Sequence, residues 1–415
     1  MTDTRNIVIL GASYAGLSAA HYFLKHVEPA LPREGRYHVH LVNPSTHFYH
    51  RIAAPRATAS SQLMPDSKSF LDIADGFKQY SKDVFTFVQA RATSLDTTSR
   101  TVTIERVHGG EETLSYHALI LATGTKSFCA TLSSQGRPHE EIKAALADMH
   151  GKLKNAKTVM IGGGGPAGVE TAAEVGEMLN GAAFMFMSGL SKPKVKVTLV
   201  AGARKLLPIL RPALAKQAET YLARVGVETV YKDKVNKTEQ LADSKTKVLL
   251  DSGKEVVVDV YIPAIGVVPM TEYVPKELLT EKGYVKTNDK TLRVDEAGPR
   301  VYAVGDCGSH TRGGIFDIYD AIPVLLTNIK RDILLADSPD AAQTKGGDRS
   351  FKAITSETQM VTVGRSKGVG AYNGRKLPSF MIWAFKGRDF MSGTAVETVN
   401  GTRWKKEVGW KPSDG

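Results

Sequence analysis

Two glycine-rich turns constrain this chain more than any other feature of its sequence. The first lies in "IVILGASYAG" at residues 7–16, and the second lies in "VMIGGGGPAGVE" at residues 159–170. A short apolar run that ends in glycine is typical of a buried strand. Where such a run leads through G-x-G-x-x-G into a helix, the pattern indicates a turn that binds a dinucleotide. The chain therefore carries two candidate dinucleotide sites.

The second turn fits this pattern at all three positions, Gly163, Gly165 and Gly168. The first glycine allows a tight turn, the second lets the backbone approach a pyrophosphate, and the third lets the helix pack close to its strand. The N-terminus of the following helix offers unpaired N–H groups to the phosphates. We therefore expect one dinucleotide to bind here.

The first turn fits less well, because its three positions hold Gly11, Ser13 and Gly16. Serine is small, and its hydroxyl can donate to a phosphate. An ordinary strand–helix turn explains this copy alone equally well, but the presence of two copies favours the dinucleotide interpretation of both. The next strand, 37–43, ends at Asn43, where such folds usually place an acid that binds the adenosine ribose.

The composition is that of a globular protein. The chain has 415 residues, of which 42% are hydrophobic, and this is enough for two or three domains. No apolar run approaches the roughly 20 residues that span a bilayer, and the N-terminus shows no basic-then-apolar signal. We therefore expect a soluble, cytoplasmic protein. An apolar segment at 181–190 and an aromatic and basic segment at 403–412 leave peripheral contact with a membrane open.

The cysteines and the net charge narrow the chemistry further. The only two cysteines, Cys129 and Cys307, are far apart, which excludes a C-x-x-C pair and a disulfide-rich fold. No His or Cys cluster has metal-ligand spacing, so we predict no metal site. The net charge of +11 favours acidic partners such as nucleotides, anionic lipids or nucleic acids, and a solvated basic surface explains it as well.

Five motifs follow one another in a specific order: "GASYAG", "ALILATGT", "IGGGGPAGVE", "YIPAIGVVP" and "VYAVGDC". This order resembles the flavoproteins with two dinucleotide-binding domains, the pyridine nucleotide–disulfide oxidoreductase superfamily, over residues 5–330. Three further segments, 47–57, 361–374 and 383–390, are similar to the apoptosis-inducing-factor-2 / ferroptosis-suppressor group, which is related to type II NADH dehydrogenases.

The resemblance implies an α/β fold with two Rossmann-like domains and a small C-terminal α+β domain. The FAD-binding domain would span 1–130 and 268–345, the NAD(P)H-binding domain 131–267, and the C-terminal domain 346–415. It also implies an FAD-dependent NAD(P)H oxidoreductase. Such a protein passes hydride from NAD(P)H to FAD and then electrons to a quinone-like acceptor, here without a redox-active disulfide.

Individual residues are expected at each cofactor by the same resemblance. At FAD these are Gly11, Ser13 and Gly16 at the pyrophosphate, Asn43 at the ribose, Arg56 near the flavin, Ala92 at the adenine through its backbone, Thr123 and Gly124 beside the flavin, and Asp306 at the ribityl chain or diphosphate. At NAD(P)H they are Gly163, Gly165, Gly168, Arg204 and Gly266.

Two residues are expected to act in catalysis. Glu170 would lie near the nicotinamide and Lys386 near the flavin, where Lys386 or Arg56 could stabilise the negative charge of the reduced ring. The alternatives stay open, because a glutamate in the first turn of a helix is favourable on its own. Lys386 and Arg388 could likewise form the basic edge of a hairpin, and His47 and His50 are expected to be loop or packing residues.

The choice between NADH and NADPH depends on the end of the strand at 194–202. An acid there would accept from the ribose 2′-hydroxyl, but Ala201 and Gly202 occupy the place, with Arg204 and Lys205 beside them. An absent acid and a nearby arginine suit a 2′-phosphate. We therefore predict use of NADPH, or of both nucleotides.

A second class of function is a redox-gated signalling or nucleic-acid-binding flavoprotein of the apoptosis-inducing-factor type. This class needs a concentrated basic face, yet no block of five or six basic residues occurs. Nucleic acid is therefore not an expected partner. A third possibility is a flavin reductase or oxidase that passes electrons to oxygen or to a protein. It stays open because nothing in the sequence encodes the second substrate. The sequence also leaves the oligomeric state open.

Overall fold

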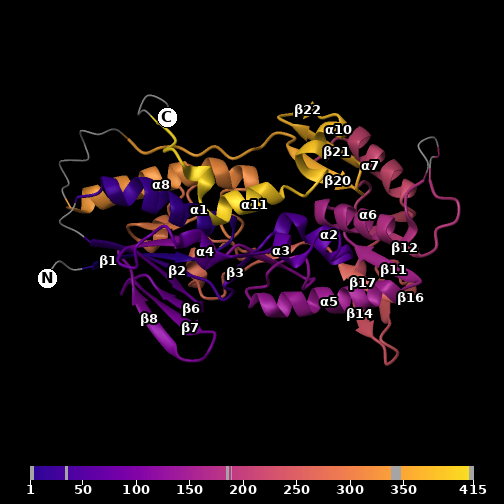
Figure 1. The fold of residues 1–415 in the computed structure, drawn as a ribbon, viewed down its shortest axis with the longest axis horizontal. Helices are drawn as coiled ribbons and strands as arrows, with labels where there is room; N and C mark the ends of the chain where they lie inside the picture. The colour runs from indigo at the N-terminus through magenta and orange to yellow at the C-terminus, as the bar shows by residue number, and fades with distance from the viewer. Residues whose placement is uncertain (1–3, 33–35, 184–186, 188, 338–346, 411–415) are drawn as a thin grey trace.

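The structure is a computed structural model that describes residues 4–32, 36–183, 187, 189–337 and 347–410. Two parallel sheets lie one after the other along the long axis of the molecule, and a small antiparallel sheet covers the second (Figure 1). The expected α/β fold with two Rossmann-like units is confirmed.

The first sheet has the strand order β19-β9-β1-β2-β5, and all neighbouring strands are parallel. Its strands are β1 (Thr4–Leu10), β2 (Arg36–Val42), β5 (Phe85–Val88), β9 (Ala118–Leu121) and β19 (Val301–Ala303). The extended segment 85–96 contains two strands. Its first half is β5 of this sheet, and its second half is β6 (Ala90–Asp96) of a separate meander.

The second sheet repeats this plan with the order β13-β12-β11-β17, again with parallel neighbours. Its strands are β11 (Thr158–Gly162), β12 (Lys196–Ala201), β13 (Val227–Tyr231) and β17 (Val260–Pro263). The remaining short strands pair as β3 (His47–Tyr49) with β4 (Phe70–Asp72), and as β10 (Thr125–Ser127) with β18 (Val267–Pro269).

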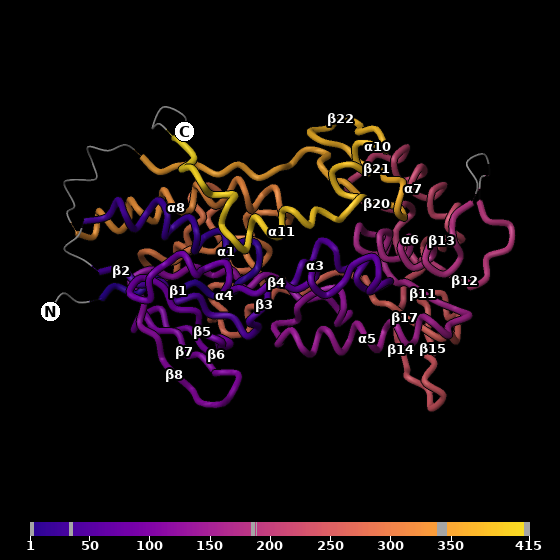
Figure 2. The backbone as a smooth tube through the Cα atoms, in the orientation of Figure 1, coloured from indigo at the N-terminus to yellow at the C-terminus, as the bar shows by residue number. Residues whose placement is uncertain are grey.

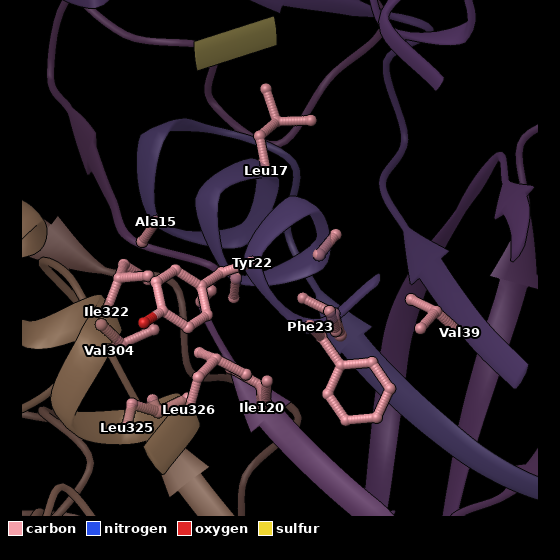
Figure 3. Close-up of a cluster of buried hydrophobic side chains, with 14 of the residues drawn as sticks. Ala15, Leu17, Tyr22, Phe23, Val39, Ile120, Val304, Ile322, Leu325 and Leu326 are labelled. Atoms are coloured by element: carbon pink, nitrogen blue, oxygen red, sulfur yellow. The ribbon is translucent and has the colours of Figure 1, made fainter. Parts of the chain in front are cut away.

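Each parallel sheet has helices on one face and a three-stranded meander on the other. In β1, Ile7 and Ile9 pack with α1 (Tyr14–Tyr22) and α8 (Ile315–Asp337), while Val8 and Leu10 pack toward the meander. This alternation is the period of two that a strand imposes. Figure 3 shows the helix side, where Tyr22 lies beside Ile322 of α8 and Phe23 lies near Ile120 and Val39 of the strands.

The other elements complete these layers. The meanders are β6 with β7 (Thr101–Arg106) and β8 (Glu111–Ser115), and β14 (Val235–Gln240) with β15 (Thr246–Leu250) and β16 (Glu255–Val258). The helices of the second unit are α5 (His139–Asn155), α6 (Pro166–Asn180) and α7 (Pro212–Arg224). Three short helices follow the first unit's second strand: α2 (Ala54–Ala59), α3 (Asp66–Ser69) and α4 (Ile73–Phe77).

The C-terminal segment divides between the two units. Its sheet, β20 (Gln359–Val363), β21 (Lys367–Tyr372) and β22 (Arg375–Lys376), packs on α6 and α7, and residues 373–374 form the turn between β21 and β22. Helices follow this sheet: α10 (Ser379–Ile382), a π-helix (Trp383–Gly387) and α11 (Ser392–Val399). Figure 2 shows this yellow segment running back to α11, which contacts α1.

The two segments that left peripheral membrane contact open, 181–190 and 403–412, are described only in part. Trp404 of the segment 403–412 is only 4% exposed and packs against Tyr22 and Tyr319. Residues 184–186 and 188 of the other segment lie outside the described part of the chain. Among the helices that can be described, none is both long and apolar enough to cross a membrane.

His21 fixes the returning segment to α1. The imidazole is fully buried, stacks on Phe77 with ring centroids 4.0 Å apart, and lies 2.8 Å from the Val399 carbonyl through Nε2. Burial lowers the pKa of His21 to about 3, and Val399 opposes this only in part. The folded protein therefore keeps His21 neutral at pH values where the unfolded chain binds a proton.

We predict that the free energy of unfolding falls as the pH falls through the unfolded value of about 6.5 towards 4. The His21→Gln variant, whose amide can still donate to Val399, should lose part of this slope, about 1.4 kcal/mol per pH unit. Urea denaturation at several pH values measures both slopes. Identical slopes would show that His21 is not held neutral.

Candidate functional site

Two cavities lie at the carboxyl ends of the two parallel sheets. The first, of about 480 Å³, runs along the turn between β1 and α1. The second, of about 920 Å³, runs along the turn between β11 and α6. Tyr14, Arg51, Asp306 and Ile318 line both cavities, so the cavities meet at these four residues. Ligand sites at this edge of a sheet are the rule for open α/β folds.

The first glycine turn has no room for side chains at its outer positions. Gly11 has φ +102°, and a Cβ there would lie 2.4 Å from the Ala122 carbonyl oxygen. A Cβ at Gly16 would lie 1.7 Å from the Gly11 oxygen. Ser13 precedes α1 but makes no side-chain bond to its first turn. The helix N-terminus at the first cavity is therefore left for an anion.

The second turn repeats this geometry closely. Gly163 has φ +117°, and a Cβ there would lie 2.1 Å from the Ala264 oxygen, while a Cβ at Gly168 would lie 1.8 Å from the Gly163 oxygen. A Cβ at Gly165 would meet nothing within 4 Å, so this glycine opens on the second cavity. The three glycines thus have the positions that the sequence pattern predicts.

Most of the residues expected at FAD line the first cavity. They are Gly11, Ser13, Asn43, Ala92, Thr123, Gly124 and Asp306. Asn43 Oδ1 accepts from the Ala12 N–H at 3.0 Å, and its Nδ2 donates to the Ser45 carbonyl at 2.7 Å. Asn43 therefore also holds the glycine turn in place. An ionised acid at this position could accept from the Ala12 N–H but could not donate to the Ser45 carbonyl. The residues present fit a dinucleotide in this cavity.

Arg56, which is expected near the flavin, lines neither cavity. It is 4% exposed, and its guanidinium is bound to both carboxylate oxygens of Glu174 at 2.9 Å. A buried arginine needs such a partner, and the partner turns it toward α6 and away from the cavities.

Arg51 is the arginine that the sequence reasoning missed. It lies five residues earlier in the same segment and lines both cavities. Its Nη1 donates to Thr125 Oγ1 at 3.0 Å and lies 3.5 Å from Asp306 Oδ2. The quoted segment 47–57 contains both arginines, but nothing local to it indicates which one faces the cavities.

Glu170 and Lys386 come together across 216 residues of sequence and both line the second cavity. Lys386 Nζ donates to Glu170 Oε1 at 2.6 Å and to the Met360 carbonyl at 3.2 Å. Glu170 Oε1 also accepts from the Thr362 N–H at 2.9 Å. The Lys386 side chain is 13% exposed and belongs to a π-helix, so the alternative of a hairpin edge is wrong.

Arg204, which is expected at NAD(P)H, is exposed and lines neither cavity. Gly202, Ala203 and Lys234 line the second cavity at this place, as does Gly266 farther along. The Lys234 stem lies over Gly202, because a Cβ on that glycine would come within 2.4 Å of Lys234 Cγ. Lys234 follows β13, whereas Arg204 follows β12. The sequence around Arg204 therefore does not indicate that this lysine lines the cavity.

His50 links the shared wall to the C-terminal segment. Its Nε2 lies 2.8 Å from the Phe390 carbonyl, which can only accept, so Nε2 carries the proton and Nδ1 accepts from Tyr14 Oη at 2.6 Å. Burial lowers the pKa of His50 to about 4. The expectation that His50 is a packing residue is consistent with its full burial.

Neither of the two cysteines lines either cavity. Cys129 and Cys307 are both free and buried, and burial raises the pKa of Cys307 to about 11. Within the residues that the structure describes, no group of three or more His, Cys, Asp or Glu side chains could hold a metal ion.

Comparison with known proteins agrees with this geometry. Oxidoreductase phnG of Penicillium herquei is 45% identical over 412 residues, which cover 98% of each chain. Ferroptosis suppressor protein 1 of Homo sapiens is 24% identical over 404 residues, 95% of each chain. NDH2 from Plasmodium falciparum, solved with NADH, shares the fold with a TM-score of 0.63 at 12% identity, over 97% of this chain and 99% of that one.

The family model described as pyridine nucleotide-disulphide oxidoreductase matches residues 5–323. This range contains both glycine turns and both parallel sheets. The chain therefore belongs to the pyridine nucleotide-disulphide oxidoreductase family of oxidoreductases.

Proposed function

We propose that this chain is an FAD-dependent oxidoreductase that takes hydride from NAD(P)H and passes electrons to a quinone-like acceptor. The observation that carries the proposal is the shared wall of the two cavities at Tyr14, Arg51, Asp306 and Ile318. Two dinucleotides held at the two glycine turns would extend toward this wall from opposite sides. Their reactive rings would then meet there.

The residues of the first cavity would hold FAD and those of the second would hold NAD(P)H. FAD, when bound, supplies the acceptance of hydride and its onward transfer as electrons. The chain binds and orients the two partners through the N-termini of α1 and α6. The backbone at Ala92 and the turn at Thr123 and Gly124 complete the first cavity.

Two ion pairs line the cavities, one at the shared wall and one in the second cavity alone. Arg51 lies close to Asp306, and Lys386 is bound to Glu170, so each cation is balanced by an acid before any ligand arrives. Fixed charges in a site with little water act strongly on charge that develops during a reaction. Arg51 and Lys386 are thus the cations that would stabilise negative charge on a reduced ring.

The thiols and the cavity wall support a quinone-like acceptor. Because the two cysteines are free and buried, no thiol pair is available to take electrons. The second cavity also has an apolar wall, which includes Ile52, Pro55, Leu132, Ile265, Val267, Ile315 and Ile318. Such a wall suits a flat, apolar acceptor that enters after the oxidised nucleotide leaves.

We predict that the purified protein oxidises NADPH anaerobically with menadione as acceptor and gives parallel double-reciprocal plots. This pattern is expected because the nucleotide and the acceptor would use the second cavity in turn. The matched control is Cys129→Ala with Cys307→Ala, which should keep its rate within about twofold. Reduction of a disulfide substrate such as DTNB, with no reduction of menadione, would contradict the proposal.

We predict that Lys234→Gln raises the KM for NADPH about tenfold and leaves the KM for NADH nearly unchanged, because a lysine attracts a 2′-phosphate. Arg204→Gln, a matched change in an exposed residue outside the cavity, should have a smaller effect. Steady-state kinetics with each nucleotide measure both. Equal changes for NADH and NADPH, or a larger effect of Arg204→Gln, would contradict the role of Lys234.

A further inference from the structure

We infer that Arg56 is a positioning residue that holds Lys386 in the wall of the second cavity. Arg56 lines no cavity itself, and 330 residues of sequence separate it from Lys386. Its contacts nevertheless fall on the segment that carries Lys386. The kinetic part of the test below rests on the proposed function, while the structural part does not.

The segment that carries Lys386 has a backbone that needs support from elsewhere. Residues Trp383–Gly387 form a π-helix, and the Arg388 N–H donates to the Trp383 carbonyl at 2.8 Å. Phe390 and Met391 follow with φ +52° and +62°, in the left-handed region that non-glycine residues rarely adopt. Short π-helices and left-handed residues are both unfavourable unless the surrounding structure holds them.

Arg56 and His50 supply that support from the segment 50–56. Arg56 Nη1 donates to the Arg388 carbonyl at 3.2 Å, and its guanidinium carbon lies 4.5 Å from the centre of the Phe390 ring. His50 Nε2 donates to the Phe390 carbonyl at 2.8 Å. The backbone just after the π-helix is therefore held at two successive points by side chains of the first unit.

Glu174 fixes Arg56 on the same helix that receives Lys386. α2, which carries Arg56, packs against α6, and the two lie side by side in Figure 1. Glu174 lies one turn after Glu170 on α6, and these two glutamates bind Arg56 and Lys386 respectively. Arg56 and Lys386 also flank the Phe390 ring, with the Lys386 Nζ 5.9 Å from its centre. The two ion pairs thus form one unit around Phe390.

The test needs a variant that removes Arg56 without leaving a buried charge. Glu174 is 2% exposed, and burial raises its pKa despite the opposing effect of Arg56, so a lone Glu174 would weaken the fold. The variant Arg56→Leu with Glu174→Met replaces the pair by apolar side chains of similar volume, a change that folded proteins often tolerate. Arg365→Met is the control: it removes the Arg365–Glu177 ion pair from another part of α6, while Glu177 Oε2 still accepts from the N–H of residue 365 at 2.6 Å.

The structural part is hydrogen exchange of the full chain, followed by mass spectrometry of peptides that cover 383–391. We expect exchange there to rise about tenfold in the Arg56→Leu, Glu174→Met variant, because local opening becomes easier when the contacts are lost. Arg365→Met should leave these peptides unchanged. Unchanged exchange in the double variant, or an equal rise in the control, would overturn the inference.

The kinetic part is a mutant cycle that compares the Arg56→Leu, Glu174→Met variant, Lys386→Met and the triple variant that combines them. Its readout is the rate of flavin reduction by NADPH, measured by stopped flow. If Arg56 acts through Lys386, the triple variant should be no slower than Lys386→Met alone. Losses that multiply would mean that Arg56 acts by another route and would overturn the inference. No effect of Lys386→Met would count against the proposed role of Lys386, and the exchange result would then decide alone whether Arg56 holds the segment.

Discussion

The close contact of each glycine turn with its own helix and the neighbouring strand is the constraint on which the rest of the structure depends. Any side chain at Gly16 or Gly168 would overlap the carbonyl oxygen of the first glycine of its turn. Each helix therefore begins directly at the carboxyl end of its sheet, with its N–H groups toward a cavity. Because this happens twice, two helix N-termini face cavities that share a wall.

Charge pairing on α6 explains why the C-terminal segment belongs to the same site. Glu170, Glu174 and Glu177 occupy one face of this helix at the spacing of successive turns. Each is buried, and a buried carboxylate needs a partner. The partners are Lys386, Arg56 and Arg365, which come from three separate segments. These pairs set the C-terminal sheet on α6 and bring a lysine to the second cavity.

The sequence predicted well those features that local chemistry decides. Both glycine turns, the strands that precede them and the helix α5 follow from patterns within a few residues. The proximity of Glu170 and Lys386 was implied only by the family resemblance, because their spacing of 216 residues carries no local signal. In the tail, the residues after Pro378 fold as helices that pack on other elements, so tertiary contacts decide their structure.

Two of the predicted arginines, Arg56 and Arg204, do not line a cavity, for a related reason. Arg51 and Arg56 lie in one short segment, and only the position of Glu174 on α6 decides which of them turns away from the cavities. Lys234, and not Arg204, lines the second cavity at this place, because the loop after β13 folds over Gly202. No pattern in the sequence near Arg204 reveals this contact between two loops. Side-chain direction in such cases is set by tertiary partners and not by neighbours in sequence.

The most direct test of the central claim is an anaerobic titration of the purified protein with NADPH and then with NADH, followed by absorbance. The account predicts a flavin that stays with the protein and is bleached by the nucleotides, because the two cavities meet at Tyr14, Arg51, Asp306 and Ile318. A protein without flavin, or with a flavin that neither nucleotide reduces, would contradict it.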